Sequence, residues 1–171
     1  MYTKMQKFLI AFLLIGIPIP VAAQTPSSAP TIVTGADLTK VLPTSYFFRG
    51  LSVTVQARNS SALKYSDGFL VLAGLVDTSG YSSDIRQKYV GFFITEKPLT
   101  LAAKTLPPGE YGMGFKADGK FHILDVAANE LLTADATKDV KLAHPVPLKF
   151  VVENGETRLY LGRMYVTLAA Q

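Results

Sequence analysis

The chain has 171 residues, a formal net charge of +4 at pH 7 and no cysteine. The lack of cysteine excludes a disulfide framework, thiol catalysis and zinc held by cysteine. Basic and acidic residues alternate without clustering, and Lys4 and Lys7 account for two of the 17 basic residues. Nucleic acid is therefore not an expected partner, because steering a polyanion requires a summed positive field.

The first 23 residues have the three parts of a secretory signal peptide. Lys4 and Lys7 form a positive start, residues 8–17 form a short apolar core, and Val21-Ala22-Ala23 provides small side chains before a cleavage site. A membrane anchor is the alternative, but a span needs about 20 apolar residues, and two prolines interrupt this shorter run. We predict that residues 1–23 are removed, leaving a periplasmic or secreted protein without a membrane span.

Removal of residues 1–23 leaves 148 residues, the size of one domain. Residues 24–43 predict a flexible leader and a short helix, because residues 24–34 are rich in proline, serine and threonine. Thr34 begins the helical pattern and Pro43 ends it. Residues 44–171 predict a β domain.

Short runs of β-branched and aromatic residues recur from Tyr46 onward, separated by turn signals. Residues 69–76 are nearly all apolar and predict a strand buried on both faces. Asp118-Gly119 and Asn154-Gly155 predict hairpins, and Asn59-Ser60-Ser61 predicts a turn. The spacing favours an all-β fold: a single antiparallel sandwich or flattened barrel of about ten strands, with a short N-terminal helix.

The loop from Asp77 to Arg86 is the candidate binding site, because it is long and joins two strongly apolar strands. Its hydrogen-bonding side chains are those of Asp77, Ser79, Tyr81, Asp84 and Arg86. The alternative is that Asp77 and its neighbours are ordinary turn residues that bond to nearby backbone amides.

No motif indicates a cofactor, a metal or a catalytic residue. The run Asp77-Thr-Ser-Gly80 resembles the aspartic protease signature, but a serine intervenes, and a single copy would need a homodimer to pair two carboxylates. His122 falls in a predicted strand and is expected to be a surface or core-edge residue. Neither His122 nor His144 has the spacing of metal ligands.

Two features indicate close packing or a binding face. Gly112 and Gly114 leave one strand face bare, which favours approach of a neighbouring segment over a ligand groove. Tyr46, Phe47 and Phe48 are consecutive, so at least one is expected at the surface.

The chain resembles a family of small, uncharacterised exported bacterial proteins. The strings that carry this resemblance are Arg58-Asn-Ser60, Asp67-Gly68, Gly74-Leu-Val-Asp-Thr-Ser-Gly-Tyr81, Leu106-Pro-Pro-Gly-Glu-Tyr-Gly-Met-Gly-Phe115 and Pro145-Val-Pro-Leu148. The resemblance implies export and one compact domain, and it supplies no catalytic or binding residues.

The leading hypothesis is a non-enzymatic exported domain that binds a small ligand or an envelope partner protein. One alternative is a hydrolase or isomerase centred on the Asp77–Arg86 loop, which expects a raised pKa at Asp77 or Asp84. Another is a structural subunit of an envelope assembly, which expects exposed edge strands without charges or prolines.

Overall fold

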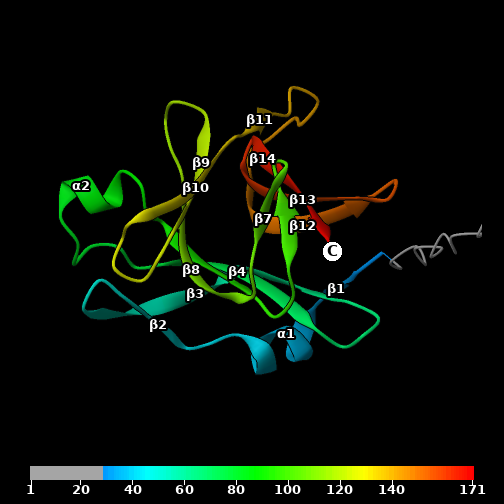
Figure 1. Cartoon of the computed structure of the whole chain (residues 1–171), viewed down its shortest axis with the longest axis horizontal. Helices are drawn as coiled ribbons and strands as arrows, with labels where there is room; N and C mark the ends of the chain where they lie inside the picture. The colour runs from blue at the N-terminus through cyan, green and yellow to red at the C-terminus, as the bar shows by residue number, and fades with distance from the viewer. Residues whose placement is uncertain (1–28) are drawn as a thin grey trace, which may run out of the picture.

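The computed structural model describes residues 29–171, so the predicted signal peptide lies outside the described residues. Two antiparallel sheets pack face to face as an open sandwich rather than a closed barrel, which confirms the predicted all-β class. Figure 1 shows β12, β13 and β14 on one side of β3 and β4, with α1 and β2 on the other. Neither helix in the described residues is long and apolar enough to cross a membrane.

The larger sheet has eight strands in the order β1-β3-β4-β5-β8-β9-β10, and β2 pairs with β3. Their bounds are β1 (Thr31–Val33), β2 (Ser45–Phe48), β3 (Leu51–Lys64), β4 (Leu70–Val76), β5 (Gly91–Thr95), β8 (Gly109–Phe115), β9 (Lys120–Leu124) and β10 (Glu130–Asp135).

The smaller sheet has six strands in the order β12-β13-β14-β6-β7, and β11 pairs with β14. Their bounds are β6 (Leu99–Leu101), β7 (Lys104–Leu106), β11 (Thr137–Lys138), β12 (Val146–Glu153), β13 (Glu156–Gly162) and β14 (Met164–Ala170). The described residues thus hold fourteen strands rather than about ten. The excess includes strands of two or three residues, such as β7 and β11, which are too short to show alternation.

Two hydrophobic cores lie on opposite faces of the larger sheet. Strand β4 supplies both: Val71 and Ala73 belong to the core between the sheets, whereas Leu72 and Val76 belong to the second core. The prediction that this strand is buried on both faces is confirmed. The second core is covered by β2, by helix α1 (Gly35–Val41) and by the segment that contains helix α2 (Ser83–Arg86).

Residues 24–28 of the predicted flexible leader lie outside the described residues, and the part that follows differs from the prediction. The short helix forms as α1, with Thr34 at its N-terminus, but Thr31–Val33 forms β1 and pairs with Ala62–Lys64 of β3. Leu38 and Val41 of α1 pack against the second core. The proline, serine and threonine content of this segment did not predict its order. A few apolar residues on one face are enough to order a segment that can pair with the open edge of a sheet.

The predicted turn at Asn59-Ser60-Ser61 is wrong, because β3 continues through these residues. The register of β3 against β4 shifts between Val55 and Ser60, a bulge-like irregularity that places residues 56–59 opposite the single residue Leu75. Within the bulge, the Ser60 hydroxyl donates to the Gln56 carbonyl at 2.9 Å, and the Asn59 amide donates to the Gln56 side chain at 2.9 Å. The turn-forming side chains therefore support a bend in one strand instead of ending it.

Candidate functional site

Three loops meet at one end of the larger sheet, termed here the three-loop end. They are the turn 49–50 between β2 and β3, the segment 77–89 that contains α2, and the turn 125–129 between β9 and β10. Loops carried on a rigid sandwich are common binding elements.

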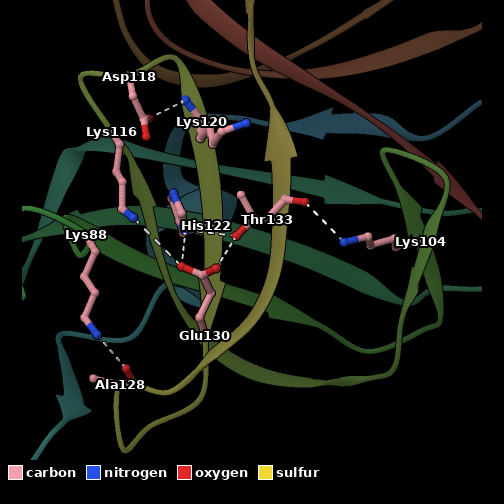
Figure 2. Close-up of polar contacts among 9 residues, drawn as sticks. All are labelled: Lys88, Lys104, Lys116, Asp118, Lys120, His122, Ala128, Glu130 and Thr133. Atoms are coloured by element: carbon pink, nitrogen blue, oxygen red, sulfur yellow. Dashed lines mark hydrogen bonds and ion pairs between the residues drawn. The ribbon is translucent and has the colours of Figure 1, made fainter.

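Hydrogen bonds across these loops hold them together. The Arg49 backbone N–H donates to the Val126 carbonyl at 2.8 Å, and the Arg49 guanidinium donates to the Ala127 carbonyl at 2.8 Å. The Lys88 ammonium donates to the Ala128 carbonyl at 3.0 Å (Figure 2). All three contacts join segments that are far apart in the sequence.

An aromatic cluster beneath the loops supports them from inside. The Phe48 ring stacks on the Tyr89 ring, with centroids 3.8 Å apart, and meets the Tyr81 ring edge-on at 6.0 Å. A Cβ at Gly112 would lie 2.4 Å from the Phe48 ring. The bare glycine face is therefore filled by an internal neighbour, as the packing interpretation expects.

The turns are locked in conformations that side chains rarely adopt. Arg49 has φ of 49° and Ala128 has φ of 70°, both in the left-handed region. The Asp125 carboxylate accepts the backbone N–H groups of Ala127 and Asn129 at 2.9 and 2.8 Å, and the Asn129 side-chain amide at 2.8 Å. These bonds, led by the Asn129 side chain, lower the pKa of Asp125. Such strain persists only where surrounding contacts enforce it.

Apolar side chains are exposed on these locked turns. Phe47 is 58% exposed and Val126 is 45% exposed, whereas Tyr46 and Phe48 on either side of Phe47 are buried. The expectation that one of the three aromatic residues lies at the surface is confirmed. A hollow of about 410 Å³ lies beside Phe47. Its lining, termed the tip surface, comprises Phe47, Arg49, Gly50, Val126 and Ala127.

The predicted binding residues of the 77–86 loop do not converge on one point. Asp77 and Ser79 line a separate hollow of about 290 Å³ beside the start of β3. The Ser79 backbone N–H donates to the Asp77 carboxylate at 3.0 Å and lowers its pKa, as ordinary turn chemistry does.

Tyr81 is buried, and its hydroxyl donates to the Phe48 carbonyl at 2.7 Å. It supports the turn of β2 and β3 from below instead of contacting a ligand. Asp84 and Arg86 are exposed and are absent from the linings of both hollows. The sequence therefore indicated a loop that adjoins the tip surface and a surface aromatic residue among Tyr46, Phe47 and Phe48, but it gave no sign of Val126, whose turn meets that of Phe47 only in the fold.

A second polar cluster lies on β9 and β10 in the same part of the molecule (Figure 2). His122 Nδ1 lies 2.6 Å from Glu130 Oε2, and the Thr133 hydroxyl donates to Glu130 Oε1 at 2.5 Å. Lys116 Nζ lies 3.9 Å from the same carboxylate. The Thr133 hydroxyl, followed by His122, lowers the pKa of Glu130.

The histidine of this cluster lacks the access that a general base needs. When a carboxylate accepts a hydrogen bond from Nδ1–H of a histidine, the lone pair of Nε2 remains as the basic site of the ring. This is the arrangement found in a general base. His122 is only 2% exposed, however, and its Nε2 is buried without a hydrogen-bond partner among the described residues. The side chain thus joins two strands internally.

Comparisons with known proteins identify no relative. The chain matches no protein-family model, no curated protein and no solved structure. Across residues 29–171, no group of three or more histidine, aspartate or glutamate side chains is arranged to hold a metal ion.

Proposed function

We propose that the chain is an exported, non-enzymatic domain that binds an envelope partner protein through the tip surface. The observation that carries this proposal is the exposure of Phe47 and Val126 on turns that cross-loop hydrogen bonds hold in place. Rigid turns lose little conformational entropy on association. Phenylalanine and arginine, here Phe47 and Arg49, are also residue types enriched in protein–protein interfaces.

Export is supported by the sequence of residues 1–23 and by the resemblance to exported bacterial proteins. The positive start, apolar core and small residues before the cleavage site match a secretory signal. The expected test result is a mature protein from cells that begins at Gln24. A mature chain that retains Met1 would contradict export by signal peptidase.

A protein partner is favoured over an internal small ligand because the cores are filled. Side chains of both sheets occupy the space between them, including the fully buried Phe93, Phe121 and Leu159. The tip surface is a shallow, mostly apolar depression beside Phe47 and Val126, against which side chains of another protein can pack.

The hydrolase or isomerase alternative is not favoured at the Asp77 loop. It expects a raised pKa at Asp77 or Asp84, whereas the backbone N–H of Ser79, followed by its side-chain hydroxyl, lowers the pKa of the Asp77 carboxylate. A lowered pKa keeps the side chain ionised and makes it a weaker base.

A structural subunit of an envelope assembly is expected to have edge strands that are free to pair with another chain. Among the described residues, two edge strands instead carry features that hinder such pairing. Edge strand β12 carries Pro147 and Lys149 and has an irregular register between Val146 and Lys149. Edge strand β10 has an irregular register between Glu130 and Leu132. Proline, charge and bulges on an edge disfavour the addition of another strand.

The test is site-specific photo-cross-linking in the native host. A photoreactive side chain at position 47 or 126 is expected to give one discrete protein adduct, whereas the same group at position 69 is expected to give none. Phe69 is a matched control because it is an aromatic side chain, 48% exposed, in the turn between β3 and β4. Excess unlabelled wild-type protein should suppress the adduct, and excess Phe47→Asp protein should not. Identical adducts at all three positions, or none at 47 and 126, would overturn the proposal.

A further inference from the structure

A separate hollow with a basic lining lies on the outer face of the smaller sheet. It has a volume of about 220 Å³ and is bordered by β11, the loop that follows it, β13 and β14. Its lining comprises Lys138, Asp139, Val140, Lys141, Arg158 and Tyr165. Three cationic side chains from different elements therefore surround one concavity.

Arg158 is held in a single position at this hollow. Its guanidinium lies 4.6 Å from the centre of the Tyr165 ring and forms an ion pair with Glu156. The other Glu156 oxygen accepts the Thr167 hydroxyl at 3.1 Å. Both oxygens of the Glu156 carboxylate therefore have a partner, and the planar Arg158 guanidinium is already oriented before any ligand binds.

Asp139 is used to build the loop. One carboxylate oxygen accepts the Lys141 backbone N–H at 2.9 Å, and the other accepts the Tyr160 hydroxyl at 2.9 Å. These bonds fix the path of the chain between β11 and the following loop, so both oxygens of this carboxylate already have a donor.

Lys138 and Lys141 are the cations of the hollow that have no ion-pair partner among the described residues, and together with the negative Asp139 they leave it one net positive charge, since Arg158 is paired with Glu156. Within residues 29–171, the side chain of neither lysine forms an ion pair or a hydrogen bond. Like charges that face one concavity repel each other, and a bound anion relieves that repulsion.

We propose that this hollow binds a phosphate-type oxyanion, with Lys138 and Lys141 supplying the attraction and Arg158 supplying oriented donors. Charge-assisted hydrogen bonds from an arginine fork and from lysines suit the oxygens of such a group. The site is independent of the tip surface.

The test is a titration of the full mature chain with inorganic phosphate, followed by NMR at an ionic strength held constant with chloride. Amide shifts are expected in residues 138–141 and near Arg158. Lys138→Gln combined with Lys141→Gln is expected to weaken binding about tenfold or more, because each lost contact involves a charged group. Both lysines are exposed, so these variants should fold normally.

The matched control is Lys64→Gln combined with Lys104→Gln, which removes the same charge from exposed lysines elsewhere. The control should bind phosphate within about twofold of wild type. An equal loss in the control would show that only net charge matters and would overturn the site.

A second arm tests whether the oxyanion belongs to a lipid headgroup. Vesicles of phosphatidylglycerol in phosphatidylcholine are compared with vesicles of phosphatidylcholine alone. Sedimentation with the anionic vesicles that depends on Lys138 and Lys141 would assign the site to a headgroup, whereas a response to inorganic phosphate alone would assign it to a free anion. No dependence on these lysines in either arm would overturn the proposal.

Discussion

Single side chains in the second core differ in how well their polar atoms are satisfied. The Tyr81 hydroxyl has an acceptor in the Phe48 carbonyl, whereas the buried Tyr46 hydroxyl has no partner among the described residues. Burial raises the pKa of both tyrosines, most strongly that of Tyr46. A buried hydroxyl without a partner loses its bonds to water and gains nothing in return.

Tyr46→Phe is therefore expected to raise the free energy of unfolding by about 1 kcal/mol, because it removes an unpaired group and keeps the ring that stacks on Phe92. Tyr81→Phe is expected to lower it by about 1 kcal/mol, because the Phe48 carbonyl loses its donor. Urea denaturation measures both. Equal destabilisation by the two substitutions would contradict this difference.

The Glu130 carboxylate couples stability to pH. Its folded-state pKa lies below the ordinary value of 4.5, through the Thr133 hydroxyl and then His122. A lowered folded-state pKa adds stability that is present above the unfolded value and is lost as the pH falls through the folded value. The stability advantage of wild type over Glu130→Gln should therefore shrink as the pH is lowered from roughly 6 to 3.

Urea denaturation at several pH values measures this difference. Glu153→Gln is the control, since the exposed Glu153 side chain forms no ion pair among the described residues. An unchanged difference between wild type and Glu130→Gln across this range would argue against a stabilising role for the ionised Glu130.

Elements meet closely where the segment after α2 crosses β8. A Cβ at Gly114 would lie 2.2 Å from the Lys88 carbonyl oxygen, which is backbone and has little freedom to move. The next contact along this crossing is the bond from Val90 N–H to the Met113 carbonyl at 2.8 Å. The sequence predicted the close approach from the paired glycines, but only the fold shows which segment makes it.

Gly114→Ala is expected to lower the free energy of unfolding by about 1–3 kcal/mol, the usual cost of overpacking. The Val90 amide should also exchange faster with solvent, because the crossing segment is displaced. Gly80→Ala is the control: its Cβ would meet only Leu51, at 3.6 Å. Comparable losses in the two variants would show that the crossing is not the cause.

The hairpins show which turns local sequence can specify. Asp118-Gly119 joins β8 to β9, and Asn154-Gly155 joins β12 to β13, as predicted. Asn154 and Gly155 have φ of 52° and 78°, which such residues adopt readily. The turn at Arg49 was not predicted, because arginine rarely adopts its φ of 49° without outside support. The bonds from Arg49 to the β9–β10 turn supply that support.

At the scale of the whole molecule, the larger sheet is a middle layer. The smaller sheet covers one face, and the N-terminal segment with β2 lies on the other (Figure 1). The segment that contains α2 adds Tyr81 and Tyr89 to the second core. Residues of α1 therefore belong to the folded unit instead of forming part of a leader.

This layering predicts unequal effects of two substitutions in α1. Leu38→Ala is expected to lower the free energy of unfolding by about 1–2 kcal/mol, because the half-buried Leu38 packs against the second core. Thr39→Ala is expected to change it by less than about 0.5 kcal/mol, because Thr39 is exposed on the same helix. Thermal and urea unfolding measure both, and a silent Leu38→Ala would indicate that α1 adds nothing to the fold.

Local sequence determined the all-β class, the double burial of β4, the two glycine hairpins and the surface position of one aromatic residue near Tyr46. These features depend on side-chain alternation and turn preferences that act over a few residues. Which loops meet, and where the tip surface lies, depends on contacts between segments that are far apart in the chain. Arg49 and Ala127 are 78 residues apart in the chain. Their contact depends on how three layers pack, because no local pattern specifies which distant segments a sheet brings together.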